Sequence, residues 1–412
     1  MKSSASTFIT LTVVAQVVLM VATWSLWFCE TDYPQIALLT SAVNLPIWLD
    51  QVLSIALIAG CAALVVVHFK SIAVSSKDDS SKFLKTASSG CCCLILSCSG
   101  ALVVLDQHRL QPWHWLTMLL LAEYIFLNGN HFRKVAKVTL ATIYIFAAAS
   151  RFGPDVAAGM SGNVLKVVLQ TLNLPEIRPT ESKFFLLATI MNSIEFLIGF
   201  ALLIQRTRRA AVIAAVLLHL TLVTCLSPWG LNHHAGVLVW NLFLMLAIPA
   251  LFLSRDHQIA TAANDTPKSA ARSFQANQFV ARLLMAIVVL IPASGLFGFA
   301  DNWIAWQVYS PRPEVLKLSV DESQIQFLPA SLQPFVQPPQ PLRSDCPIRL
   351  DRWSLHCKQV PIYPEDRFQI ATAKQIVRQA QKQGASRAAF KAQLTFPSQF
   401  PWWKRSTIDV KL

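Results

Sequence analysis

Long apolar runs recur along this 412-residue chain from residue 8 to residue 299. The hydrocarbon core of a bilayer is about 30 Å thick, so a membrane helix needs roughly 20 such residues. Charged residues make up only 14% of the chain, against about a quarter in soluble domains. The sequence therefore predicts a polytopic membrane protein. Nine candidate spans follow from it: 8–28, 45–69, 87–105, 113–127, 135–149, 184–204, 210–226, 235–253 and 279–299.

The predicted fold is an all-α membrane helix bundle with about nine transmembrane helices and a small C-terminal α+β domain outside the membrane. The fourth and fifth spans are short, so partly re-entrant segments are the alternative and the number could change by one. A signal peptide has an apolar region of about 7 to 15 residues. The run 8–28 is longer, so we expect it to be retained.

Loop charges predict the orientation, because Lys and Arg concentrate in cytoplasmic loops. With the N-terminus inside, the basic connections that begin near Lys70, Arg133, Arg206 and Arg255 all fall in the cytoplasm. The net charge of +13 is explained in the same way, and no motif indicates nucleic-acid binding. Nine spans then place the C-terminus outside the cytoplasm.

The chain changes character after residue 309, which divides it into a membrane domain, 1–309, and an extracytoplasmic soluble domain, 310–412. Frequent prolines favour strands and turns at its start. We expect strands at 348–356 and 360–363 and a helix at 371–383. Cys346 and Cys357 would lie in an oxidising compartment, where they could form a disulfide or remain two unpaired thiols.

The segment 227–241, S-P-W-G-L-N-H-H-A-G-V-L-V-W-N, concentrates polar residues between two apolar runs. We interpret it as the mouth of the bundle. His233 and His234 could act as a proton or redox relay or as metal ligands, or could simply belong to an interfacial loop. The residues that accompany them as candidate binding groups are Trp229, Asn232, Trp240 and Asn241.

Ionisable residues inside membrane helices usually face the bundle interior. Glu195, Glu123 and His219 lie within predicted spans and could form a relay with the paired histidines, or could make structural polar contacts. Arg151 follows Tyr144 by two helical turns. It either extends toward the interface or binds an anion or lipid headgroup.

Several classes of site lack support in the sequence. The chain has no C-x-x-C, so it predicts neither a thioredoxin-like dithiol nor a zinc ribbon. No ligand cluster has metal-binding spacing. The run Asp301–Ser310, D-N-W-I-A-W-Q-V-Y-S, suits an aromatic belt at the membrane surface.

The segments 144–154 and 227–241 resemble the DoxX/MauE/HTTM grouping of bacterial membrane proteins. The first is similar to a Y-x-x-x-G-x-x-K-x-x-P pattern, with Ala148 for the glycine and Arg151 for the lysine. The resemblance implies a bacterial inner-membrane protein. MauE-like members are implicated in redox or disulfide maturation, and HTTM proteins are related to the vitamin K-dependent carboxylase. The missing C-x-x-C argues against a direct dithiol role, and no residue here matches the catalytic lysine of the carboxylase.

Two functions follow from these observations. The first is an accessory or scaffold component that binds a quinone, a lipid or a periplasmic protein, because no catalytic constellation is complete. The alternative is a membrane-embedded oxidoreductase or HTTM-like enzyme that uses Glu195, His219, His233 and His234 around a polar cavity. The enzyme hypothesis requires these groups to converge.

Overall fold

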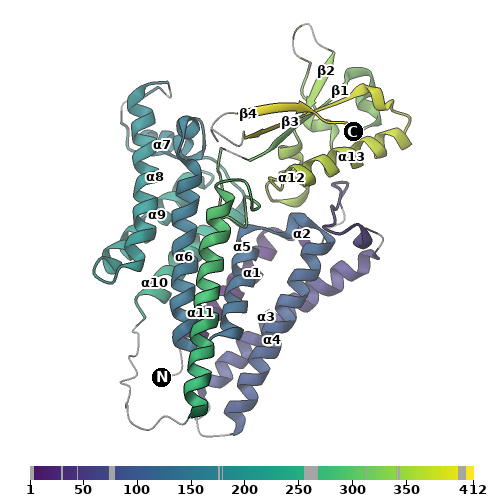
Figure 1. Ribbon diagram of the computed structural model, residues 1–412. Helices are drawn as coiled ribbons and strands as arrows, with labels where there is room; N and C mark the ends of the chain where they lie inside the picture. Colours follow the sequence, from purple (N-terminus) through teal and green to yellow (C-terminus); the bar gives the residue numbers. More distant parts are fainter. Residues whose placement is uncertain are drawn as a thin grey trace.

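The protein, seen in a computed structural model, is a helical bundle with a four-stranded sheet at one end (Figure 1). The structure describes residues 4–28, 31–43, 45–73, 79–174, 177–178, 180–254, 268–311, 313–339, 341, 344–397 and 405–412. Arg255 lies outside these residues. The bundle helices are α1 (Ser4–Ala22), α2 (Trp24–Trp27), α3 (Ile47–Ala73), α4 (Asp79–Leu105), α5 (Pro112–Phe126), α6 (Gly129–Arg151), α7 (Met160–Thr171), α8 (Ser182–Leu203), α9 (Arg208–Leu226), α10 (Ala235–Phe252) and α11 (Lys268–Gly295).

Seven of the described helices are long and apolar enough to cross a bilayer: α1, α3, α4, α8, α9, α10 and α11. An eighth results if α6 and the segment that ends with α7 are one span, broken by a bend of 102°. The protein is therefore an integral membrane protein, but the predicted count of nine is not confirmed. The difference lies in α5 and α6. Helix α5 has 15 residues, or about 22 Å at 1.5 Å per residue, and α6 begins with a polar, basic segment.

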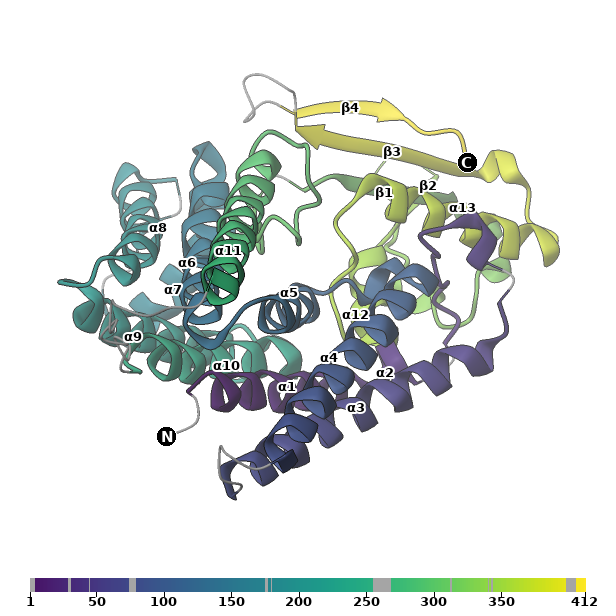
Figure 2. The same cartoon turned by 60° about the horizontal axis from the view of Figure 1, so that its bottom comes forward.

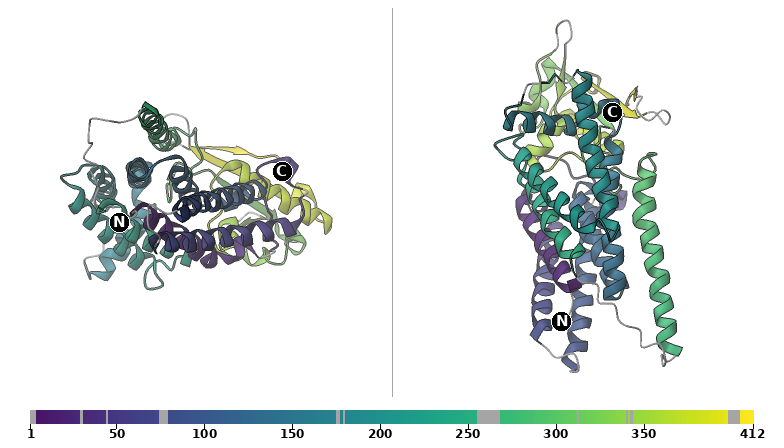
Figure 3. Two further views of the ribbon diagram at one scale, coloured as in Figure 1. Left: turned by 90° about the horizontal axis from the view of Figure 1, so that it is seen from below. Right: turned by 90° about the vertical axis from the view of Figure 1, so that its left-hand side faces the viewer.

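Side chains exposed on the outside of the bundle are largely apolar, as lipid contact requires. Leu197, Leu220 and Leu246 are each at least half exposed, whereas the interior holds a continuous apolar core. Helix α11 stands at the edge of the bundle beside α6 (Figure 3). Helix α1 packs against α3, α5 and α10, and so joins the two halves of the bundle.

The C-terminal part forms an antiparallel sheet with strand order β2-β1-β3-β4. Its elements are β1 (Val315–Asp321), β2 (Asp345–Ile348), α12 (Leu350–Lys358), α13 (Asp366–Lys382), β3 (Phe390–Pro397) and β4 (Arg405–Asp409). Helix α13 covers one face of the sheet, and strands β3 and β4 extend past it (Figure 2).

The helix predicted at 371–383 is confirmed by α13, but the strand predicted at 348–356 is wrong. Its residues form the end of β2 and then α12, because Leu350, Trp353, Ser354 and Cys357 recur at helical spacing and are all buried. No strand is assigned at 360–363, which is described throughout.

The sheet domain rests on loops of the bundle. Arg109, in the short helix η2 (Gln107–Arg109), makes a buried bidentate ion pair with Asp50 at the start of α3. Each of its two N–H···O hydrogen bonds measures 2.8 Å. The neighbouring His108 donates from Nε2 to the carbonyl oxygen of Pro361 at 2.8 Å. The Arg109–Asp50 pair holds this loop on the bundle, and the His108 bond joins the loop to the C-terminal domain.

Candidate functional site

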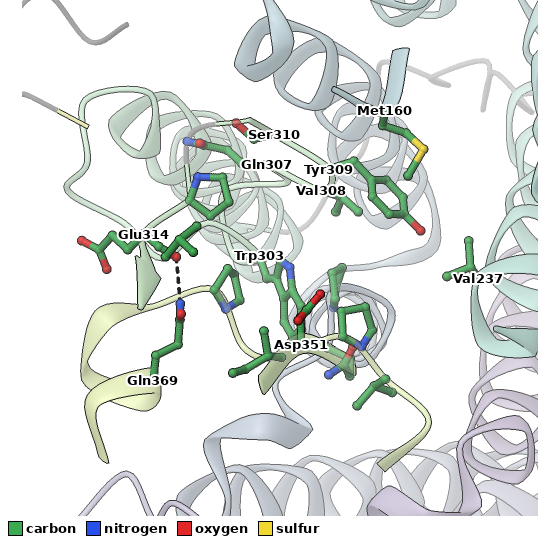
Figure 4. A pocket seen from close by; sticks show the side chains of 18 of the residues that line it. Met160, Val237, Trp303, Gln307, Val308, Tyr309, Ser310, Glu314, Asp351 and Gln369 are labelled. Carbon is green, nitrogen blue, oxygen red and sulfur yellow. Dashed lines mark hydrogen bonds between the residues drawn. The ribbon is translucent and has the colours of Figure 1, made fainter. Parts of the chain in front are cut away.

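One cavity of about 1450 Å³ lies between the ends of the bundle helices and the sheet. In Figure 4, Met160 and Val237 come from α7 and α10 on one side, while Asp351 and Gln369 belong to the C-terminal domain. Trp303 and Tyr309, from the loop after α11, lie between them. The cavity is thus shared by the helical bundle and the C-terminal sheet domain.

Three side chains from three helices form a hydrogen-bonded chain on the cavity wall. The Tyr144 hydroxyl on α6 lies 2.6 Å from His219 Nε2 on α9, and His219 Nδ1 lies 2.9 Å from Asn241 Oδ1 on α10. All three residues are buried. Asn241 Nδ2 donates to the Val237 carbonyl at 2.9 Å, which turns the amide oxygen toward the imidazole. His219 therefore carries its proton on Nδ1 and accepts the Tyr144 O–H at Nε2.

Local packing explains why these helices meet here. Gly199 on α8 lies against α6, where an added Cβ would come within 2.6 Å of Ile145 Cγ1 and 3.0 Å of Tyr144 Cβ. Helices α9 and α10 form an antiparallel pair joined by the turn 227–234. In that turn the Leu231 amide returns to the Cys225 carbonyl at 2.8 Å, and Gly230 packs on the same carbonyl. The turn sets His219 opposite Asn241.

An ion pair lies beside this chain. Arg151, at the end of α6, contacts Glu195 Oε1 on α8 at 2.6 Å, and its Nε donates to the Ala147 carbonyl at 2.9 Å. The two side chains are 12% and 14% exposed, so the pair is largely desolvated but accessible from the cavity. A guanidinium held in this way can receive an anionic or carbonyl oxygen.

The predicted mouth divides into residues that reach the cavity and residues that do not. His234 and Trp240 line it together with Asn241. His233 packs edge-on against Tyr309 at a centroid distance of 5.9 Å. Burial lowers the pKa of both His233 and His234, and the Arg352 cation lowers each further, so both are neutral at pH 7.

Trp229 and Asn232 do not border the cavity, and they fit the alternative of an interfacial loop. Trp229 is 91% exposed, which suits an interfacial anchor and not a ligand contact. Asn232 occupies a left-handed conformation, φ 50°, that closes the turn before α10. Of the candidate site residues, the structure brings together Tyr144, Arg151, Glu195, His219, His234, Trp240 and Asn241 around the cavity.

Other predicted groups lie apart from the cavity lining. Glu123 is buried between α5 and α6, where the Thr139 hydroxyl donates to it at 2.5 Å. Cys346 on β2 and Cys357 on α12 are both free and buried, which corresponds to the second alternative, two unpaired thiols. Among the described residues, no three His, Cys, Asp or Glu side chains are grouped as a metal site would require.

Sequence reasoning did not find the cavity residues of the loop after α11. Trp303 and Trp306 are 6% and 1% exposed, so they are packed inside the protein and do not form a lipid-facing belt. Ser161 and Asn192, joined by a hydrogen bond of 2.7 Å, also line the cavity. Trp306 and Tyr309 adopt left-handed φ of 60°, a conformation that no pattern in the sequence indicates.

The arrangement is suited to moving a proton. The Tyr144 oxygen can accept a hydrogen bond from an O–H group in the cavity while its own proton passes to His219 Nε2. The resulting imidazolium keeps its Nδ1–H on the Asn241 oxygen, and the nearby Arg151 stabilises negative charge left on the ligand.

Comparisons of the chain with protein-family models, curated proteins and solved structures found no match.

Proposed function

We propose that this integral membrane protein is an enzyme that transfers a proton at the headgroup of an amphipathic substrate. The observation that carries the proposal is that the Tyr144–His219–Asn241 chain and the Arg151–Glu195 pair face one cavity. Burying polar side chains costs desolvation free energy. A protein that serves only as an accessory component has no need to keep two such arrangements side by side.

The roles follow from the contacts. Tyr144 and His219 exchange the proton, Asn241 holds the imidazole in the required tautomer, and Arg151 with Glu195 orients the substrate oxygen. His234 and Trp240 border the same space. The walls contributed by Ile143, Leu218 and Leu244 suit an apolar tail.

Quinols are the simplest test substrates for this chemistry, since they combine an ionisable hydroxyl with an apolar tail. Quinol oxidation would make the protein an oxidoreductase, in keeping with the resemblance to the DoxX/MauE/HTTM grouping. The charge pattern of the loops supports an inner-membrane protein with a cytoplasmic N-terminus and an extracytoplasmic sheet domain. The cavity then opens toward the outer half of the bilayer.

The test measures oxidation of a short-chain quinol by a soluble electron acceptor, with purified protein in nanodiscs. The quinol loses two protons and two electrons, and the acceptor takes the electrons. We expect Tyr144→Phe to lower the rate about a hundredfold, the usual contribution of a general acid–base group, with quinol binding nearly unchanged.

Trp229→Ala is the matched control, because this aromatic side chain is 91% exposed and does not border the cavity. Its rate should equal that of the unmodified protein. A Tyr144→Phe variant that oxidises quinol at the full rate would exclude the proposed role. So would an unmodified protein that is no faster than the uncatalysed reaction.

A further inference from the structure

The cavity is too large for a quinone ring alone. Pockets for small ligands measure about 300–1,000 Å³, whereas this one has about 1450 Å³. Its lining continues from the bundle helices onto β1, β2, β3 and β4. A molecule that fills the site therefore extends from the apolar helix walls to the sheet.

The sheet presents one polar face. Along β1, Leu316, Leu318 and Val320 are buried against the domain core, so Lys317 and Ser319 point to the opposite face. On β3 the same alternation leaves Lys391 and Gln393 on that face. All four of these polar side chains line the cavity.

Strand register arranges this face in two rows. Lys317 pairs with Gln393, which pairs with Asp409 on β4, and Gln393 Nε2 donates to Asp409 Oδ1 at 3.1 Å. The second row runs from Pro347 on β2 through Ser319 to Lys391. Directly opposed side chains on one face lie about 5 Å apart. The polar members of the two rows therefore form one patch of donors and acceptors, with the apolar ring of Pro347 at its edge.

This surface carries no excess of cations. Lys317 and Lys391 are accompanied by Asp345 and Asp409, and Arg349 is already paired with Asp351 at 2.6 Å. The carboxylates of Asp321, opposite Asp345, and of Glu314, in the cavity lining, add further negative charge. Such a surface has no preference for an anion. Alternating donors and acceptors suit hydroxyl groups, each of which donates one hydrogen bond and accepts others.

We propose that the substrate is an amphiphile with a neutral, hydroxyl-rich headgroup of the saccharide type, bound on the polar face of the sheet. Its tail lies between the helices, and the junction of head and tail lies at Tyr144 and Arg151. This inference rests on the proposed function and names its substrate class. A simple quinol would occupy only the part of the cavity within the bundle.

The experiment compares three lipids with identical acyl chains: a glycosyl diacylglycerol, an anionic phosphatidylglycerol and a diacylglycerol without a headgroup. Protein is extracted with native nanodiscs from vesicles that contain all three in equal amounts, and the co-purified lipids are quantified by mass spectrometry. We expect the glycosyl lipid to be enriched about tenfold over diacylglycerol. The double variant Lys317→Ala/Gln393→Ala should abolish this enrichment, since two lost hydrogen bonds correspond to roughly that factor.

The matched control is Gln381→Ala/Lys382→Ala, the same residue types on the exposed surface of α13. It should retain the enrichment, and both double variants should melt at the temperature of the unmodified protein. Preferential recovery of the anionic lipid, or an unchanged glycosyl enrichment in Lys317→Ala/Gln393→Ala, would overturn the proposal. The proposed proton transfer is judged separately, by the response of quinol oxidation to Tyr144→Phe.

Discussion

Glu365 connects the C-terminal domain to the loop that carries Trp303, Trp306 and Tyr309 into the cavity. Its Oε1 accepts hydrogen bonds from Asn302 N at 2.7 Å and Asn302 Nδ2 at 3.0 Å. Burial raises the pKa of Glu365 from 4.5 to about 7, and the nearby carboxylates of Asp301 and Glu314 act in the same direction. The Asn302 contacts partly oppose this effect, and Arg367 pairs with Asp301 alongside.

The pH dependence of stability follows from this raised pKa. Because the folded state binds the proton more tightly than the unfolded state, the stabilisation is complete below pH 4.5 and is lost as pH rises through about 7. We expect Glu365→Gln, which keeps an acceptor for Asn302 but cannot ionise, to remove this contribution. The melting temperature of the unmodified protein should fall relative to that of the variant across this window. If the melting temperatures of the unmodified protein and of Glu365→Gln changed in parallel with pH, the raised pKa of Glu365 would be contradicted.

The contact between α6 and α8 depends on a glycine. A Cβ at Gly199 would approach Ile145, Tyr144 and the Ala141 carbonyl oxygen at 2.6 to 3.0 Å. We expect Gly199→Val to separate the two helices, because overpacking costs about 1–3 kcal/mol and the neighbouring atoms include backbone. The variant should melt at a lower temperature and oxidise quinol more slowly, since Tyr144 and Glu195 lie on the displaced surfaces.

Gly100 on α4 is the control for this prediction. A Cβ added there meets no atom within 4 Å, so Gly100→Ala should preserve both stability and rate. Equal activity of Gly199→Val and the unmodified protein would show that the close approach of α6 and α8 is not required.

The sequence predicts those parts of the fold that depend on local composition. Apolar length identifies most of the membrane helices, and the spacing of Ile376, Val377 and Ala380 identifies α13. The segment 348–356 contains residue types that favour strands, but its buried residues recur at helical spacing. Burial of one helical face in the C-terminal core, beside α2, favours helix there, which composition alone does not reveal.

In the candidate site, too, some contacts can be expected from the sequence and others depend on tertiary packing. His219 and Asn241 belong to consecutive helices joined by a short turn, so their proximity can be expected from the sequence. The Arg151–Glu195 pair joins helices that are separated by α7 and a loop, and Tyr144 reaches His219 across 75 positions. These contacts depend on the three-dimensional order of the helices. Residues of β1 and β3 enter the cavity only because the sheet domain is placed over the bundle.

At the scale of the whole molecule, the cavity depends on how the two parts are joined. The core of the C-terminal domain includes Tyr33, Ile36 and Trp303, which belong to loops of the bundle. Tyr33 lies between Trp353 and His108 at centroid distances of 4.6 and 5.5 Å. The domain is therefore attached by shared apolar packing as well as by the His108–Pro361 hydrogen bond.

Removal of this aromatic ring should detach the sheet from the bundle before the helices unfold. Tyr33 is 1% exposed, and truncation of a buried aromatic residue to Ala costs about 3–5 kcal/mol. We expect Tyr33→Ala to expose residues 310–412 to protease and to reduce retention of the glycosyl lipid, which needs the sheet. Quinol binding within the helices should decline less. If Tyr33→Ala left protease sensitivity and lipid retention unchanged, the shared core would not be what positions the sheet over the cavity. The polar contacts of His108 with Pro361 and of Gln107 with Arg367 would then have to be sufficient on their own.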